Sequence, residues 1–95
     1  MRIKLRPTPE YSAARRGLSL SARLALRFVE QAIAANPEEP GRSHFAYSVP
    51  VFPDIAVTVV ENGDLIVAFH RVSPTLLSLD LLIDRKNPPD WYRVE

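Results

Sequence analysis

The sequence predicts an α+β protein with an N-terminal strand, a helical hairpin and then an antiparallel sheet of three to four strands. Three patterns predict this class. Charged and apolar residues alternate at positions 2–6, apolar residues recur at helical spacing at positions 18–33, and apolar runs separated by turn signals follow position 44. At 95 residues, 46% of them hydrophobic, the chain suffices for one core and not for two. We therefore expect a single domain over residues 1–95.

The first helix is predicted directly after the strand at positions 2–6. Thr8 can cap its first turn, and Pro9 suits the first helical position because its missing N–H needs no partner there. Gly17 can end the helix in a left-handed conformation. A first short helix is therefore expected to begin at Thr8-Pro9-Glu10 and to stop at Gly17.

The second helix is predicted to begin after Ser19 or Ser21, since either side chain can cap it. The Asn-Pro pair at 36–37 ends it. Its predicted core stripe, with Phe28 beside it, consists of Leu18, Ala22, Ala25, Val29, Ala32 and Ile33.

A hairpin is predicted where Asn62-Gly63 joins the apolar runs 54–61 and 64–71, because both loop positions of such a turn need positive φ. Both faces of this hairpin are apolar. One face is expected to pack on the helices, and the other needs a cover from the C-terminal segment or from a second chain. The loop predicts the opposed pairs Val59 with Ile66, Val57 with Ala68, Ile55 with His70 and Asp54 with Arg71.

Two further runs complete the predicted sheet. Residues 45–51 alternate as a strand does, but Pro50 cannot donate to a ladder, which indicates an edge strand or a bulge. The apolar run 76–84 can form a last strand. Residues 85–95 are expected to be an irregular C-terminal tail.

The composition excludes several classes of site. The chain has no cysteine and only two histidines, so we expect no disulfide, no metal site and no cofactor. The first residues are basic without the apolar run of a secretory signal, and no stretch is long enough to span a membrane, so a cytoplasmic protein is expected. Residues 1–42 carry eight Arg or Lys and four Asp or Glu, whereas residues 43–84 carry one and five.

Two groups of side chains are candidates for binding. Arg15, Arg16, Arg23 and Arg27 could form a positive helical face for nucleic acid or an acidic partner, although arginines outside an apolar stripe are more often solvated surface. Trp91 and Tyr92 in the Pro-rich tail could anchor an interface or fold back onto the domain.

The order of these elements resembles the RelE/ParE-type toxins of bacterial toxin–antitoxin pairs. The likeness covers roughly residues 1–72. It extends to the Ala-rich end of the second helix, Ala-Ile-Ala-Ala-Asn-Pro at 32–37, and to a strand that ends in His-Arg, Ile-Val-Ala-Phe-His-Arg at 66–71. The resemblance implies a toxin neutralised by a protein antitoxin, acting on DNA gyrase or as a ribosome-dependent mRNA endoribonuclease.

In the RNA-cleaving branch, the resemblance implies that Arg71 stabilises the scissile phosphate and that His70 assists proton transfer. Structural roles compete with both: Arg71 can pair with Asp54 across the hairpin, and His70 can be a half-buried polar group. The strand half is acidic and the chain continues through 76–83, which favours the non-nucleolytic branch or a degenerate member of the family. The rival hypothesis is a non-enzymatic assembly module that forms a homodimer through its uncovered sheet face and tail.

Overall fold

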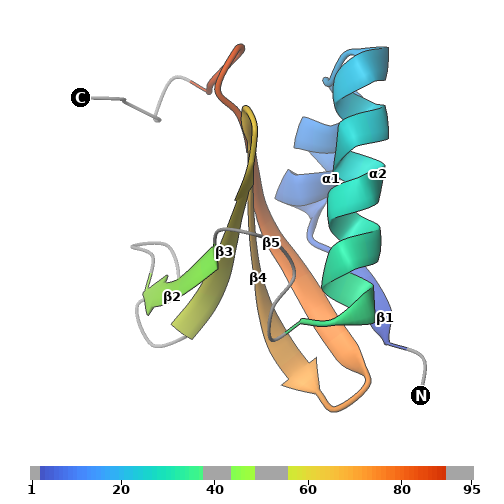
Figure 1. Ribbon diagram of the computed structural model, residues 1–95, viewed down its shortest axis with the longest axis vertical. Helices are drawn as coiled ribbons and strands as arrows, with labels where there is room; N and C mark the ends of the chain where they lie inside the picture. The colour runs from blue at the N-terminus through green and yellow to red at the C-terminus, as the bar shows by residue number, and fades with distance from the viewer. Residues whose placement is uncertain (1–2, 38–43, 49–55, 90–95) are drawn as a thin grey trace.

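A computed structural model describes residues 3–37, 44–48 and 56–89 of the chain. Two helices cover one face of a five-stranded sheet (Figure 1). The structure confirms the predicted α+β class and the predicted order of strand, two helices and consecutive antiparallel strands. In chain order the elements are β1 (Lys4–Pro7), α1 (Pro9–Arg16), α2 (Leu20–Ala35), β2 (His44–Ser48), β3 (Ala56–Asn62), β4 (Leu65–Ser73) and β5 (Leu76–Asp84).

The sheet is mixed, because the first strand lies parallel to the last. The strand order is β1-β5-β4-β3-β2, and Lys4 of β1 stands opposite Leu76 of β5. The strands from β2 to β5 pair antiparallel with their neighbours in sequence. β2 is an edge strand, as the proline after it predicted, although Pro50 itself lies outside the described residues.

Both helices begin at the predicted caps. The Thr8 hydroxyl accepts from the Tyr11 N–H at 3.2 Å, and Ser19, rather than Ser21, accepts from the Ala22 N–H at 3.2 Å. The prediction for Gly17 is wrong in one respect: its φ is −80°, so α1 ends without a left-handed residue. The Gly17 N–H still donates to the last carbonyl groups of α1.

The hairpin between β3 and β4 forms, but its predicted register is wrong. Asn62 pairs with Leu65, so the two loop residues are Gly63 and Asp64. Only Gly63 has a positive φ, of 59°, which matches a turn with glycine at its first central position. Val59 therefore faces Ala68 and not Ile66. Because each partner shifts by two residues, every side chain keeps its predicted face.

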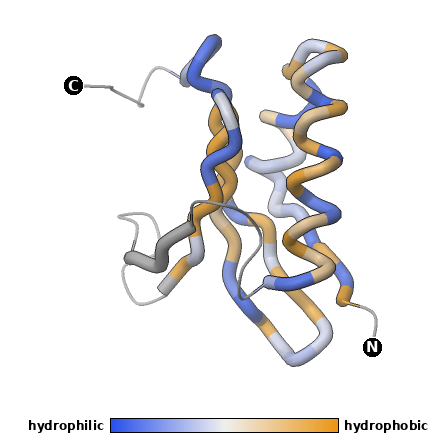
Figure 2. The backbone as a smooth tube through the Cα atoms, viewed as in Figure 1, coloured by the Kyte–Doolittle hydropathy of each residue, from blue (hydrophilic) through white to orange (hydrophobic). Residues whose placement is uncertain are grey.

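Apolar clusters fill both faces of the sheet. Figure 2 shows hydrophobic stretches along the central strands and, alternating with hydrophilic ones, along α2. The cluster toward the helices comprises Tyr11, Leu26, Val29, Ile33, Val60, Leu65, Val67, Phe69, Leu77, Leu79 and Leu82. The second cluster comprises Val57, Val59, Ile66, Ala68 and Ile83. Its members are buried within a single chain, so a second chain is not needed to cover the described part of this face.

The buried side of α2 also differs from the predicted stripe. Leu26, Val29 and Ile33 are buried, whereas Ala25 is exposed and the Phe28 side chain is 70% exposed. The helix carries more apolar residues than one face can bury, and spacing alone does not show which of two apolar lines faces the sheet.

Candidate functional site

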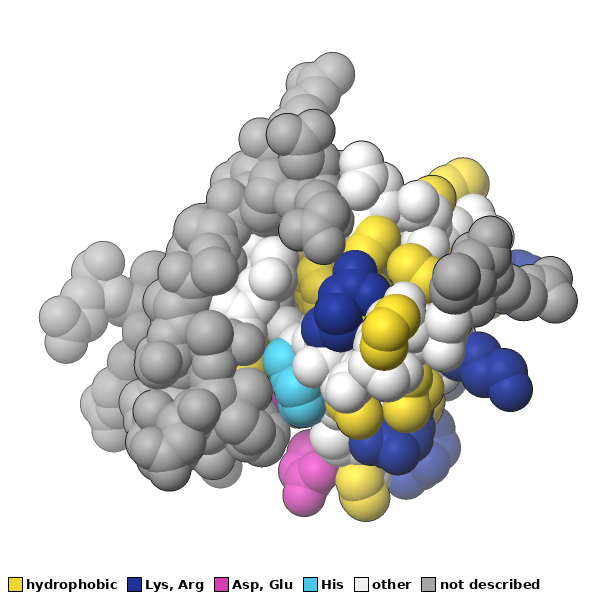
Figure 3. Space-filling view, turned by 90° about the horizontal axis from the view of Figure 1, so that it is seen from below, with side chains coloured by type: hydrophobic (Ala, Val, Ile, Leu, Met, Phe, Trp, Pro, Cys, Tyr) yellow, Lys and Arg dark blue, Asp and Glu magenta, His cyan; other side chains and the backbone are white. Residues whose placement is uncertain are grey.

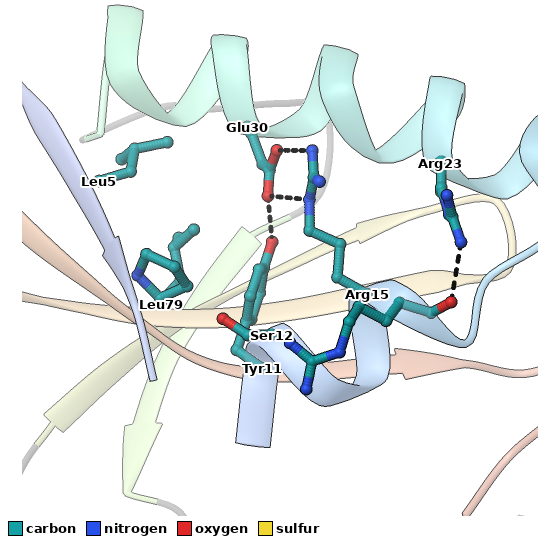
Figure 4. A pocket seen from close by; sticks show the side chains of 9 residues that line it. Leu5, Tyr11, Ser12, Arg15, Arg23, Glu30 and Leu79 are labelled. Carbon is teal, nitrogen blue, oxygen red and sulfur yellow. Dashed lines mark hydrogen bonds and ion pairs between the residues drawn. The ribbon is translucent and has the colours of Figure 1, made fainter. Parts of the chain in front are cut away.

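A cleft opens between the two helices and β1, with a cavity volume of about 410 Å³. Leu5 and Leu79 supply an apolar wall, and polar side chains from both helices approach from the other side (Figure 4). Three of the four predicted binding arginines meet here. The lining residues are Leu5, Pro7, Tyr11, Ser12, Arg15, Arg16, Arg23, Glu30 and Leu79.

One carboxylate organises the polar side of this cleft. The Tyr11 hydroxyl donates to Glu30 Oε2 at 2.8 Å. Arg15 donates two hydrogen bonds to the same carboxylate, from Nε to Oε2 at 3.3 Å and from Nη2 to Oε1 at 3.1 Å (Figure 4). This network ties α1 to α2, because Tyr11 and Arg15 lie one turn apart on α1 and Glu30 lies on α2.

The remaining arginines make the cleft positive. Arg23 donates through Nη2 to the carbonyl oxygen of Arg16 at 2.8 Å, which holds its guanidinium across the helix junction. Within the described part of the chain, neither Arg16 nor Arg23 forms an ion pair. Glu30 therefore balances Arg15 and leaves two uncompensated charges, which suits an anionic group.

Burial raises the pKa of the Tyr11 hydroxyl well above its ordinary value of 10.0, and the charge and hydrogen bond of Glu30 raise this pKa further. The Arg15 guanidinium acts in the opposite direction and only partly offsets these effects. Tyr11 is thus a neutral donor to Glu30 throughout the physiological range.

This shift predicts a stability loss in alkali. Above about pH 10 the unfolded chain releases the tyrosine proton while the folded chain keeps it, so unfolding becomes easier as pH rises. We expect Tyr11 to contribute a fall of up to about 1.4 kcal/mol per pH unit in the free energy of unfolding. Urea denaturation of the parent and of Tyr11→Phe between about pH 9 and pH 11 measures it. Equal slopes for the two proteins would contradict the assignment.

A second polar cluster lies on the sheet face opposite the helices. His70 Nδ1 is 2.6 Å from Asp80 Oδ2, and the Ser78 hydroxyl donates to Asp80 Oδ1 at 2.7 Å. Strand pairing brings the three together, because Ser78 pairs with His70 and Asp80 lies two residues from Ser78 on β5. A β-bulge lies at the same place: Ala68 pairs with Leu81 and the next residue of β4 pairs with Leu79, which leaves Asp80 as the extra residue of β5. Asp80 is only 4% exposed.

The geometry of this cluster limits its chemistry. The contact of 2.6 Å between His70 Nδ1 and Asp80 Oδ2 fixes the orientation of the imidazole ring, with the ring nitrogen as donor in the tautomer that carries its proton on Nδ1. The Ser78 hydroxyl is bound to Asp80 and not to the imidazole, so this bond does not activate it as a nucleophile. The cluster can hold a proton carrier in place, the role that the resemblance implied for His70.

Arg71 and His70 lie on opposite sides of β4. His70 shares the face of Ala68 and pairs with Ser78, whereas Arg71 pairs with Leu77, a member of the cluster toward the helices. Arg71 Nη1 donates to the Pro74 carbonyl oxygen at 3.0 Å, over the turn between β4 and β5. Figure 3 views this end of the molecule and shows basic and hydrophobic side chains next to one another.

Other predicted site residues are not brought into either cluster. Arg27 is exposed on α2 and does not line the cleft. Trp91, Tyr92 and the expected partner of Arg71, Asp54, lie outside the described residues. Sequence reasoning missed Tyr11 and Asp80. For Asp80 a signal existed, because two leucines directly after it interrupt the alternation of residues 77–80.

No family model, curated protein or solved structure matches this chain. Among residues 3–37, 44–48 and 56–89, no group of three or more histidine, aspartate or glutamate side chains could hold a metal ion. A search of the same residues finds no helix with the length and apolar character needed to cross a membrane.

Proposed function

We propose that this chain is the toxin-like subunit of a two-protein pair and that a protein partner binds the side of α2 facing away from the sheet. The observation that carries the proposal is a line of exposed apolar residues on this helix. Leu20 is 75% exposed, Leu24 is 53% exposed and Phe28 follows at the same spacing. Large apolar side chains gathered in one line are typical of a surface that a partner covers.

The element order supports the toxin-like part of this proposal by analogy with the RelE/ParE plan. For the mode of action, the separation of Arg71 from His70 argues against cleavage. Transfer of a phosphate group would need a cation and a proton carrier at the same phosphate, and alternation along β4 directs these two side chains to opposite faces. We therefore propose that the subunit acts by binding its target, with Arg71 among the contacts, and not by cutting RNA.

The rival assembly-module hypothesis receives less support. It needs an uncovered apolar sheet face, and the described apolar residues of the second face, Val57 and Val59 among them, are already buried in one chain. A homodimer through this face would therefore bury little additional apolar surface.

Induction of this chain alone in a bacterial culture is expected to stop growth, and Arg71→Ala at the same expression level is expected to relieve the arrest. The reason is that an exposed arginine contributes to target contacts more than to folding. Arg85→Ala is the control, because Arg85 is also an exposed arginine and follows the end of β5 that lies away from Arg71. Growth curves, together with the integrity of ribosome-bound mRNA, are the measurements.

Arrest with intact mRNA supports a binding mode of action. Cleaved mRNA would overturn the non-cleaving part of the proposal, and unimpeded growth of the parent culture would overturn the toxin-like part.

A further inference from the structure

The outer surface of α2 combines an apolar line with a row of arginines. Leu20, Leu24 and Phe28 recur every four residues and project opposite the buried line through Leu26 and Ile33. The apolar line extends over about 12 Å of helix, from the rise of 1.5 Å per residue. We call Leu20, Leu24 and Phe28, with Arg23 and Arg27 beside them, the outer α2 surface.

The arginines border this line on one side only. Successive residues are turned by about 100° about the helix axis. Around this axis Arg27 lies next to the apolar line, and Arg23 lies beyond it toward the cleft, where Arg23 contacts Arg16. The opposite border is small and uncharged, with Ser21, Ala25 and Ala32. The outer α2 surface is therefore continuous with the positive cleft on one side and allows close approach on the other.

No carboxylate on α2 balances these arginines. Glu30 is the only acidic residue of the helix, and it is bound to Tyr11 and Arg15. In a dimer with twofold symmetry, Arg23 and Arg27 would face either the arginines or the small, uncharged border of α2 in the second copy. Neither border offers an acidic side chain. Like charges destabilise such a contact, so the charge pattern disfavours self-association.

The pattern also disfavours a lipid bilayer as the occupant. Helices that lie in a membrane interface carry basic residues across their polar face, so that both borders of the apolar face can contact headgroups. Here one border lacks cations, and the other leads into a cleft of about 410 Å³ that suits individual side chains. A protein helix fits both borders, since it can pack closely over Ala25 and direct acidic side chains to the arginines.

We infer that the outer α2 surface binds an amphipathic helix of a partner protein, with apolar residues over Leu20, Leu24 and Phe28 and an acidic edge along Arg23 and Arg27. A carboxylate of the partner enters the cleft beside Arg16. This inference rests on the proposed function for the existence of a protein partner and adds the chemistry of that partner.

The test uses the full chain and two designed helical peptides. Both peptides carry leucines every four residues; one has glutamates along the adjacent edge, and the other has lysines at the same positions. In fluorescence anisotropy, the glutamate peptide is expected to bind about tenfold or more tightly than the lysine peptide. The double variant Arg23→Glu/Arg27→Glu is expected to reverse this preference.

Leu24→Asp is expected to weaken binding of the glutamate peptide by about tenfold or more, since it removes a central apolar contact. Val72→Asp is the matched control, because Val72 is an apolar residue on β4 with 46% exposure, away from the outer α2 surface. Both sites are exposed, so circular dichroism should show a folded protein in each case.

Equal binding of the two peptides would overturn the inference. The inference would also be overturned if the protein formed a dimer in sedimentation, or bound anionic phosphatidylserine vesicles, and if Leu24→Asp abolished that association. Peptide binding is measured without growth, so it can succeed where the arrest experiment fails. Arrest with no preference between the peptides would leave the toxin-like action standing without an acidic helix as the partner of this surface.

Discussion

Tyr11→Ala is expected to lower the free energy of unfolding by about 3–5 kcal/mol, the range for loss of a large aromatic side chain from a core. Tyr11 has no exposed surface and belongs to the cluster between the helices and the sheet. Its ring fills space that neither helix can close by moving alone, because α1 and α2 are tied through Glu30. Urea denaturation followed by circular dichroism measures the loss.

Tyr11→Phe distinguishes the contribution of the ring to stability from that of the hydroxyl. It keeps the packing and removes only the donor to Glu30, which still has Arg15, so a loss of about 1–2 kcal/mol is expected. Ser12→Ala, at the next residue of the same helix, is the control and should stay within about 0.5 kcal/mol of the parent. A Tyr11→Ala variant as stable as the Ser12→Ala control would show that the cleft is not organised around this tyrosine.

His70→Ala is expected to cost about 2–4 kcal/mol, because it leaves the buried Asp80 carboxylate with the Ser78 hydroxyl and no imidazole partner. Asp80→Asn should cost about 1 kcal/mol, since the amide still accepts from Ser78 and can donate to the other tautomer of His70. The informative result is the ranking: His70→Ala should lower the free energy of unfolding more than Asp80→Asn does. Chemical denaturation of both variants near neutral pH measures it.

A double-mutant cycle isolates the interaction. Asp80→Ala combined with His70→Ala should cost less than the sum of the two single losses, because the pair is removed together. Strict additivity would mean that the contact of 2.6 Å between His70 and Asp80 contributes no net stability.

The sequence predicts the order of elements well because each boundary has a local chemical cause. Thr8 and Ser19 accept from backbone donors within their own helix turns, and Gly63 allows the positive φ that the hairpin needs. The register of the hairpin is harder, because one glycine can occupy either central position of a two-residue turn and the neighbouring residues do not decide between them.

The sites are less predictable, because they join residues that are distant in sequence. Glu30 meets Tyr11 only after two helices have packed, and Asp80 meets His70 only after β4 and β5 have paired in the observed register. The exposure of Phe28 was equally hard to predict, because α2 has two apolar lines and only packing against the sheet determines which of them is buried.

The parallel pairing of β1 with β5 has a consequence for the time at which the chain can fold during synthesis. β1 and both helices are made first, but the strand that joins them to the sheet is the last one described, and Lys4 pairs with a residue more than seventy positions later. Closing so long a loop is slow and entropically costly. Until β5 has left the ribosome, Leu26, Val29 and Ile33 lack the leucines of β5 that complete their cluster, Leu77, Leu79 and Leu82. The inner apolar line of α2 is then less covered than in the folded protein while the outer line is exposed, so a partner or chaperone that binds the nascent chain protects it most during this interval.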